Sequence, residues 1–558
     1  MRRTRRRSRH PRQRKNRPAG GAAIASGGFG CVFSPALTCE DGPALTARQR
    51  AETISKLMTT ADAEGEIHEV EDVMPILSSI PNASTYFLGV DQSSPPRACK
   101  PNRLTSTDKM GFSTCSTAFS RAGITSSNVN SKRDELRIIN SPYGGVELEK
   151  AWTRASTAGL GVYSLGFKAL NNACRRLLKY GIVPMNKKNL LHGDIKASNI
   201  LVDVNDASRH AMVSRASLVN RLLANITPAQ AASGSDGTRP YVDARLIDWG
   251  LSMRARNGRW GGSRGVPAGL YHGKYLMYNA PISMILFSQH LQGHITHYYE
   301  ELGLDSPLSP IGKQGLMWNL ALRIYAVYRS IVGDHGHDKY LTDLIANVYA
   351  PLLVGPDAAE KGLRSSHGRM ATFQITVVEY IAEVFMHYID DSGRFMAEQY
   401  FSRVFKWNMD VYGLVTCYAP IIESGQYDDL FEWQRPLSNG VVRILAEYCF
   451  SPKYAATPIP VDKLLEDLGK LNEDPPADVH GSPGRSPAPA SPQARQSRQD
   501  RQSQQAYRKG SARRCRNGFK YRRSDGMCVP RARGSAPTRR RRCPNGTRRG
   551  RDGECHPK

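Results

Sequence analysis

Three observations predict a mixed α+β protein with a basic arm at each end. Residues 20–150 show a strand-like apolar pattern with turn signals and one helical stretch. Residues 283–470 contain little proline and many amphipathic windows at helical spacing. Positive charge is concentrated at the ends, because residues 1–18 carry ten Lys and Arg without an acid and residues 481–558 carry 22 against four acids. The body between the arms is nearly neutral, with a net charge of −1.

The length and composition predict a protein of several domains with a hydrophobic core. A chain of 558 residues has room for roughly two to four domains, and 40% hydrophobic residues are enough for a sizeable core. No run of about 18 apolar residues occurs, so we expect no transmembrane segment. The first 18 residues carry charge with no apolar stretch behind them, so we expect a disordered basic arm rather than a secretory signal.

The middle of the chain predicts helices and strands separated by insertions. Apolar residues recur at helical spacing between about 160 and 190, and short apolar strands follow at 199–202 and 244–247. Residues 205–240, between the two strands, are polar and rich in alanine, so we expect an insertion there. The stretch 91–130 is rich in Ser, Thr, Pro and Asn, and we expect it to be a loop insertion.

The C-terminal region predicts a linker followed by two small repeats. Residues 474–514 contain almost no large apolar residue and should be disordered. Residues 515–558 repeat CRNGFKYRRSDGMCVP as CPNGTRRGRDGECHP, each with two cysteines 13 or 12 positions apart and with Asn-Gly and Asp-Gly turns. This pattern favours a hairpin closed by a disulfide, because so short a segment cannot build a core. Zinc is the alternative, although its cysteine ligands are usually two to four positions apart.

The other seven cysteines are spread through the body of the chain. They are Cys31, Cys39, Cys99, Cys115, Cys174, Cys417 and Cys449. Their scattered placement predicts reduced thiols, most of them buried.

The strongest chemical signal is the run LLHGDIKASNILVD. It sets Asp194, Lys196 and Asn199 in a D-x-K-x-x-N arrangement after His192, and RLIDWG puts Asp248 at the end of a second apolar strand. Phosphoryl transfer needs a carboxylate to orient the attacking hydroxyl, a carboxylate and an amide oxygen to hold magnesium, and a lysine near the transferred group. The alternative is two unrelated loops whose Asp and Asn residues cap helices.

These spacings resemble the catalytic loop and the metal-binding loop of protein kinases. The resemblance implies that Asp194 is the catalytic base and that Lys196 lies near the γ-phosphate of ATP. It also implies that Asn199 and Asp248 bind Mg²⁺.

The same resemblance implies a two-lobed α+β fold. A small β-rich lobe would occupy residues 19–142, and a large helical lobe would occupy residues 143–473. The large lobe would carry insertions at 205–240 and 283–406.

Two N-terminal segments resemble the nucleotide-binding parts of the family. Residues 25–32 (ASGGFGCV) resemble the glycine-rich loop, with Ala25 in place of its first glycine, although an ordinary hairpin turn is the alternative. The nucleotide-binding residues implied in this loop are Gly27, Gly28, Gly30 and Val32. Residues 53–58 resemble the strand with the nucleotide lysine, here Lys56. A lysine in an apolar strand needs a carboxylate, for which Glu66 fits best and Glu69 is the alternative.

Three further segments fit the same family. The run P-Y-G-G at 142–145 resembles the hinge between the lobes, and N-A-P-I at 279–282 resembles the end of the activation segment, with Ile282 in place of Glu. The run D-V-Y-G-L at 410–414 resembles the start of the central helix, whose aspartate caps the catalytic loop in the family. A surface aspartate near a helix start is the alternative for Asp410.

The sequence also departs from most protein kinases. Gly193 stands where many members carry an arginine that gathers a phosphate on the activation loop, so we expect no need for that phosphorylation. Asp194 and Asp248 are 54 residues apart, which is unusually far. Long insertions and the C-terminal repeats resemble kinases and other proteins of large DNA viruses. Disulfides in the repeats would imply an oxidising setting such as a mature virion.

The molecule that receives the phosphate could also be a small molecule rather than a protein. The H-G-D and I-D-W runs are also similar to small-molecule phosphotransferases such as aminoglycoside and choline kinases. Those enzymes usually lack a lysine at the position of Lys196 and lack the segments at 279–282 and 410–414. We therefore expect a serine/threonine protein kinase that uses ATP and Mg²⁺ to phosphorylate a protein substrate. A catalytically weak scaffold or packaging protein with a kinase fold is the other alternative.

The basic arms predict the partners and the location. Their arginines would bind nucleic acid through its phosphates, without sequence preference, or would bind acidic virion proteins. A solubilising or nuclear-localisation tail is the alternative. We expect the protein in the host cytoplasm or nucleus, or packaged in the virion.

Overall fold

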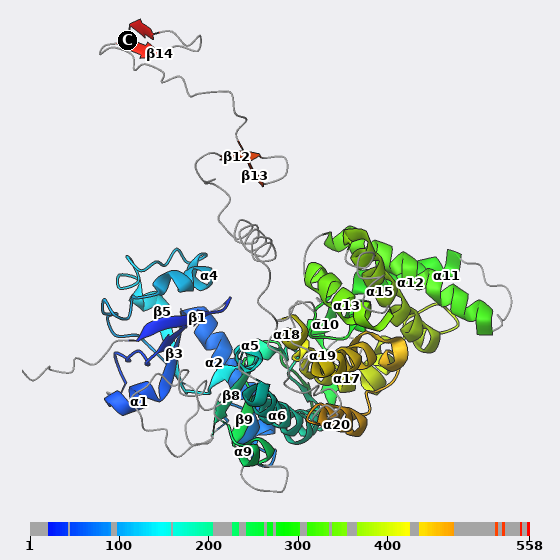
Figure 1. The fold of residues 1–558 in the computed structure, drawn as a ribbon, viewed down its shortest axis with the longest axis horizontal. Helices are drawn as coiled ribbons and strands as arrows, with labels where there is room; N and C mark the ends of the chain where they lie inside the picture. Colours follow the sequence, from blue (N-terminus) through cyan, green and yellow to red (C-terminus); the bar gives the residue numbers. More distant parts are fainter. Residues whose placement is uncertain are drawn as a thin grey trace, which may run out of the picture. The chain divides into compact units, whose positions relative to one another are not determined.

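The computed structural model describes residues 21–473 with gaps, together with four short strands near the C-terminus (Figure 1). The gaps fall at 29, 43–44, 91–96, 158–159, 205–225, 234–240, 262–264, 272–274, 302–309, 334–336, 354–364 and 424–434. The arm 1–18, the predicted linker 474–514 and most of the predicted insertion 205–240 therefore lie outside the described residues. By their contacts the residues fall into two units, Met1–Pro475 and Pro476–Lys558.

The N-terminal part is built on an antiparallel sheet of five strands in the order β1-β2-β3-β5-β4. The strands are β1 (Ala22–Ser26), β2 (Cys31–Ser34), β3 (Thr53–Thr59), β4 (Ala98–Cys99) and β5 (Leu136–Pro142). The helices α1 (Ala47–Ala51) and α2 (Thr60–Leu77) flank β3 in the sequence. Thr59 caps α2 by accepting a hydrogen bond from the backbone N–H of Asp62 (3.3 Å). The predicted strand-rich region with a helical stretch is confirmed.

The described residues of the predicted loop insertion 91–130 are mostly turns and loops, as expected, but short helical segments anchor them to the rest of the protein. The described residues from 97 onward include η1 (Phe112–Cys115) and α4 (Ser116–Phe119), and both pack into a core beside the sheet. Phe112 stacks on Phe119 at 5.9 Å between ring centroids and also contacts Phe33 of β2. A few apolar side chains among many polar ones are enough to anchor the segment, and composition alone hides them.

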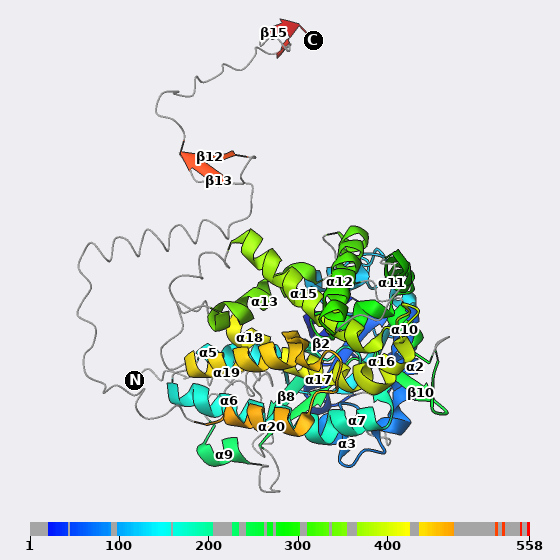
Figure 2. The same cartoon turned by 90° about the vertical axis from the view of Figure 1, so that its right-hand side faces the viewer.

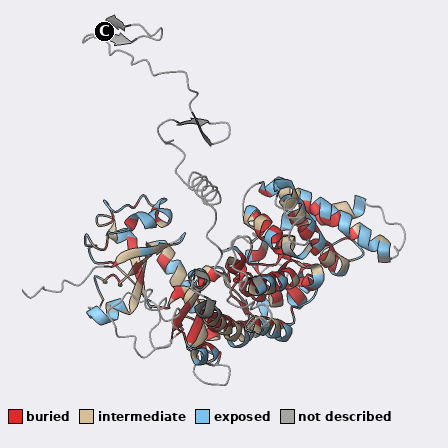
Figure 3. Cartoon of the chain, in the orientation of Figure 1, coloured by how far each residue is buried: buried red, intermediate tan, exposed pale blue. Residues whose placement is uncertain are grey.

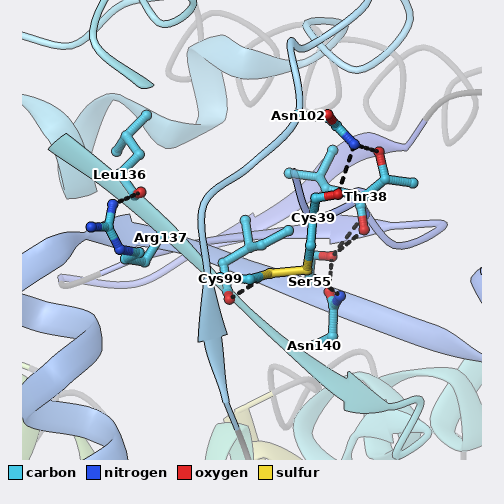
Figure 4. The surroundings of a disulfide bond; sticks show 10 residues. Thr38, Cys39, Ser55, Cys99, Asn102, Leu136, Arg137 and Asn140 are labelled. Atoms are coloured by element: carbon cyan, nitrogen blue, oxygen red, sulfur yellow. Dashed lines mark hydrogen bonds between the residues drawn. A yellow bond between two sulfur atoms is a disulfide. The ribbon is translucent and has the colours of Figure 1, made fainter. Parts of the chain in front are cut away.

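The expectation of reduced thiols is wrong for four of the seven cysteines in the body. Cys31 is bonded to Cys115 and Cys39 to Cys99, across 84 and 60 residues of sequence. The sheet brings these distant segments together, so sequence spacing could not reveal the pairs. Figure 4 shows Cys39–Cys99 with Asn102 donating a hydrogen bond to the Cys39 carbonyl (2.8 Å). The cysteines that are free and buried, as predicted, are Cys174, Cys417 and Cys449.

Reduction of these two disulfides is expected to destabilise the N-terminal part. Each bond closes a long loop in the unfolded chain, and each should contribute about 2–4 kcal/mol to the free energy of unfolding. Urea unfolding with and without a phosphine reductant measures the loss, and a Cys31→Ala/Cys115→Ala variant isolates one bond. Identical unfolding curves, with free thiols at all four positions by alkylation mapping, would refute the pairing.

The region between the N-terminal sheet and residue 283 mixes helices with two small sheets. Its helical segments are α5 (Leu148–Thr157), α6 (Leu160–Arg176), π-helical η3 (Leu177–Ile182), α7 (Val183–Lys187), η4 (Ala197–Asn199), α9 (Pro228–Ala232) and α10 (Ala268–Tyr271). One antiparallel sheet joins β6 (Val146–Glu147), β8 (Ile200–Val204) and β9 (Val242–Leu246), and another joins β7 (Leu190–Leu191), β10 (Met253–Arg256) and β11 (Arg259–Trp260). α3 (Ala83–Tyr86), which comes earlier in the chain, packs against β9 of this region. The helical spacing at 160–190 and the two predicted strands are confirmed.

From residue 283 to 470 the described segments are helical, as predicted. They comprise η5 (Ile282–Phe287), α11 (Gln289–Glu301), α12 (Pro310–Val332), α13 (Asp338–Leu353), α15 (Ser366–Tyr388), α16 (Ala397–Tyr400), η6 (Phe401–Phe405), α17 (Lys406–Thr416), α18 (Ala419–Glu423), α19 (Arg435–Leu445), η8 (Ala446–Phe450), η9 (Pro452–Tyr454) and α20 (Val461–Lys470). α15 packs against both α12 and α13 (Figure 2). Buried residues concentrate inside this part, whereas the outer faces of α11 and α12 are exposed (Figure 3).

The C-terminal unit contains two short antiparallel hairpins. β12 (Phe519–Arg522) pairs with β13 (Met527–Pro530), and β14 (Thr547–Arg549) pairs with β15 (Cys555–Pro557). Hairpins at the two repeats were predicted. Cys515 and Cys543 lie outside the described residues, so their pairing stays a prediction.

No described helix has both the length and the apolar content needed to cross a membrane. This agrees with the absence of a long apolar run in the sequence.

Candidate active site

The loop of residues 192–199, here called the Asp194 loop, is held by a buried carboxylate. Asp410 of α17 is only 1% exposed, and its side chain accepts hydrogen bonds from the backbone N–H groups of His192 (2.9 Å) and Gly193 (3.0 Å). Burial raises the pKa of Asp410, and the two N–H donors offset part of that rise. The aspartate predicted to cap this loop therefore does so, and the alternative of a surface residue is wrong.

Gly193 is required by the backbone at this point. Its φ is +77°, in the left-handed region that favours glycine. A Cβ at Gly193 would lie 2.3 Å from the carbonyl oxygen of Leu251. A larger residue would therefore push the loop away from the strand that follows Asp248.

Three side chains converge on the carboxylate of Asp194, which is 7% exposed. Lys196 Nζ lies 2.7 Å from Oδ2, and the Asn199 amide donates to the same oxygen at 3.0 Å. The Asn279 amide donates to Oδ1 at 2.7 Å. The structure thus brings together the three loop residues that the sequence selected. Asn279 also contacts Asp194, a contact that the sequence did not predict, because the N-A-P-I run was interpreted only as the end of the activation segment.

Asp248 follows β9 and lies next to the Asp194 loop. The backbone N–H of Ile247 donates to the Asn199 carbonyl (3.1 Å), and the Ile247 carbonyl contacts His192 Nε2 (3.0 Å). Asp248 itself has φ of +72°, which is uncommon for a residue other than glycine. Trp249 then packs against the His192 ring, with 4.7 Å between centroids. These contacts fix both sides of the Asp248 peptide.

The predicted lysine–glutamate pair is formed. Lys56 of β3 makes an ion pair with Glu66 of α2, and each side chain is 28% exposed. Val32 of β2 is the direct cross-strand partner of Lys56. Glu69, the alternative partner, lies one turn further along α2. Burial raises the pKa of Glu69, and the nearby charges of Glu66 and Asp248 raise it further.

The glycines of the β1–β2 turn have different surroundings. The backbone N–H of Gly27 donates to the Gly30 carbonyl (2.9 Å), which closes the turn; Phe29 lies outside the described residues. A Cβ at Gly27 or Gly28 would meet no atom within 4 Å, so the backbone there is open to a ligand. A Cβ at Gly30 would lie 2.9 Å from the Met58 side chain. Gly30 is therefore needed for packing of the turn against β3.

A Gly30→Ala substitution is expected to destabilise the protein by about 1–3 kcal/mol, because the added methyl group meets β3. Gly28→Ala is the matched control, and it should leave stability within about 0.5 kcal/mol because its methyl group enters open space. Urea unfolding of both variants measures the difference. Equal stabilities would show that the turn does not rest on β3 as described.

The segment predicted to be a hinge lies close to β8. Residues 142–145 connect β5 to β6, and Gly145 (φ +117°) lies so near β8 that a Cβ would be 2.0 Å from the Val202 carbonyl oxygen.

No group of three or more described His, Cys, Asp or Glu side chains is arranged to hold a metal. Mg²⁺ usually takes only one or two carboxylates from a protein and completes its shell with phosphates and water. Asp248, with the amide oxygen of Asn199, suits that requirement.

Comparison with known proteins gives no assignment. No family model matches the chain, and no curated protein matches it. The structure establishes a mixed α+β chain with small antiparallel sheets. Its function must come from the geometry around Asp194.

Proposed function

We propose that the chain is a serine/threonine protein kinase that transfers the γ-phosphate of ATP to protein hydroxyls. The observation that carries the proposal is the convergence of Lys196, Asn199 and Asn279 on the Asp194 carboxylate. The ion pair between Lys56 and Glu66 supplies a second, separate charged centre. A carboxylate with a nearby lysine, and a second paired lysine, is the arrangement that phosphoryl transfer requires.

In the proposed reaction, Asp194 orients the substrate hydroxyl and accepts its proton. The hydroxyl oxygen bonds to the γ-phosphorus as the bond from that phosphorus to the bridging oxygen of ADP breaks. Lys196, at 2.7 Å from the Asp194 carboxylate, is close enough to offset charge on the transferred group. Asn279 donates a hydrogen bond to the other oxygen of the Asp194 carboxylate, which fixes the orientation of this proton acceptor.

The nucleotide is proposed to bind beside β1, β2 and β3. Lys56, kept in position by Glu66, would bind its phosphates, and the open backbone at Gly27 and Gly28 would let N–H groups approach them. Asn199 and Asp248 would hold Mg²⁺, which neutralises phosphate charge when bound.

The two-lobed arrangement is also part of the proposal. The N-terminal sheet has its own apolar core, which includes Phe33 and Phe119, whereas the helical part has another that includes Leu170 and Phe405. Residues 142–145 are the short connection from β5 to β6 that a hinge would use. Separate cores support two bodies that can move against each other, with α2 reaching both of them through Ala63 and Val73.

Transfer of labelled phosphate from Mg·ATP tests the proposal. The full chain and its Asp194→Asn variant are incubated with a basic acceptor such as myelin basic protein, and labelled amino acids are identified after hydrolysis. We expect phosphoserine or phosphothreonine that is lost in the variant. ATP binding without transfer to protein would favour a small-molecule acceptor or a scaffold. Absence of ATP binding would contradict the roles of Lys56 and the glycine-rich turn.

We extend the proposal to the basic arms, of which the structure describes only the four short strands β12 to β15. Their charge favours binding to polyanions, either nucleic acid or acidic virion proteins. A chain that lacks residues 481–558, and with them a net charge of +18, should bind random duplex DNA at least tenfold more weakly. The salt dependence of DNA binding should also become weaker, because only the ten basic residues of the N-terminal arm remain, while transfer to a short peptide is unchanged. Fluorescence anisotropy at two salt concentrations measures this, and equal affinities would exclude the arm as the DNA contact.

A further inference from the structure

The carboxylate of Asp72 in α2 forms ion pairs with two arginines of β10, a strand that lies about 180 residues later in the sequence. Arg254 of β10 forms an ion pair with the Asp72 carboxylate, and Arg256 Nη2 lies 3.0 Å from the same Oδ1. The side chains of Asp72 and Arg254 are 24% and 25% exposed, whereas Arg256 is 67% exposed. Figure 2 shows β10 next to α2. The inner pair is thus shielded, and the outer arginine adds a solvent-facing contact.

β10 is itself tied to the Asp194 loop. Its Met253 and Arg254 pair with Leu191 and Leu190 of β7, the strand that ends just before His192. β10 also begins five residues after Asp248. The contact with Asp72 therefore connects α2 to the two segments that carry Asp194 and Asp248.

Between Ala63 and Val73, the apolar side chains of α2 are only partly buried: Ile67 packs beside the sheet and Val70 against the helical core. Ala63 packs with the sheet and Val73 with the helical core, and no α2 residue between them is fully buried. Glu66 lies in this stretch. Charged contacts at Glu66 and at Asp72 therefore add to partly buried apolar packing in restraining the rotation of the helix.

We infer that Asp72 is a positioning residue that holds α2 in the rotation from which Glu66 reaches Lys56. The inference rests on the proposed kinase function and adds a regulatory consequence. Arg254 and Arg256 are both paired with an internal carboxylate, and Gly193 has no side chain with which to gather a phosphate. The nucleotide site is therefore assembled without phosphorylation of the segment that follows Asp248.

An Asp72→Asn variant tests the role through the kinetic constants. We expect the KM for ATP to rise about tenfold or more with the KM for the protein acceptor unchanged, because displacement of Glu66 leaves the nucleotide lysine, Lys56, without its partner. Asp72→Glu should restore most of the loss. Glu71→Gln is the matched control, since Glu71 is exposed on the same helix. Arg254→Gln combined with Asp72→Asn should lose little more than either change alone.

Two further measurements keep the inference separate from the proposed function. Amide hydrogen exchange over residues 60–77 should be faster in Asp72→Asn than in Glu71→Gln, whether or not the wild type transfers phosphate. Unchanged exchange together with an unchanged KM for ATP would overturn the positioning role. Treatment of the wild type with a protein phosphatase should leave its activity intact. Loss of activity after that treatment would overturn the independence from phosphorylation. A wild type that transfers no phosphate would refute the kinase, and the exchange result would still decide the role of Asp72.

Discussion

An Asp194→Asn variant is expected to lose about a thousandfold of its phosphotransfer rate while it keeps its fold and its affinity for ATP. Asparagine preserves the shape of the side chain but cannot accept the proton of the substrate hydroxyl, and general-base catalysis commonly contributes 10²–10⁴. It also removes the charge that Lys196 and Asn279 contact at 2.7 Å each. Single-turnover transfer from labelled ATP measures the rate, and calorimetry measures nucleotide affinity.

The control for this variant is Asp391→Asn. Asp391 is an exposed acid on the turn before α16, so its loss should change neither transfer nor binding. Transfer by Asp194→Asn at the rate of the wild type would mean that another group accepts the proton. A parallel loss of ATP affinity would mean that Asp194 acts on the nucleotide rather than on the acceptor.

An Asp410→Ala variant is expected to lose about 2–5 kcal/mol of stability, and with it the order of the Asp194 loop. Two buried backbone N–H groups, those of His192 and Gly193, would lose their acceptor, and each unsatisfied donor costs about 1–3 kcal/mol. Urea unfolding measures the first effect. The transfer rate of the folded fraction measures the second, and it should fall even under conditions in which the variant stays folded.

The pH dependence of this loss has a defined sign. Burial raises the folded-state pKa of Asp410 above its ordinary value of 3.8, so the folded protein holds this proton more tightly than the unfolded chain does. The stabilisation by Asp410 is therefore complete below pH 3.8 and declines as the pH rises toward the folded-state pKa. The difference in unfolding free energy between wild type and Asp410→Ala should shrink over that interval. A difference that grows with pH would contradict a raised pKa.

Local spacing predicted the parts of the site that lie close together in the chain. Asp194, Lys196 and Asn199 share one loop, and Lys56 and Glu66 are ten residues apart on a strand and the helix that follows it. Periodicity likewise predicted the helices after residue 283, because amphipathic spacing is a property of the segment itself.

The long-range contacts could not be predicted in this way. Asn279 meets Asp194 across 85 residues, and Arg254 meets Asp72 across 182. Such contacts depend on how β7, β9 and β10 are packed, which periodicity does not encode. The same reason hid the disulfides, since no property of Cys31 alone indicates Cys115 as its partner.

The nested arrangement of the two disulfides changes what a single cut in the backbone does. Cys39–Cys99 closes a loop inside the larger loop closed by Cys31–Cys115. A protease that cuts once between residues 40 and 98 leaves both fragments joined by both bonds. Lys56 then stays covalently linked to the strands around it. After a single cut in this interval, the two fragments separate only when both disulfides are also reduced.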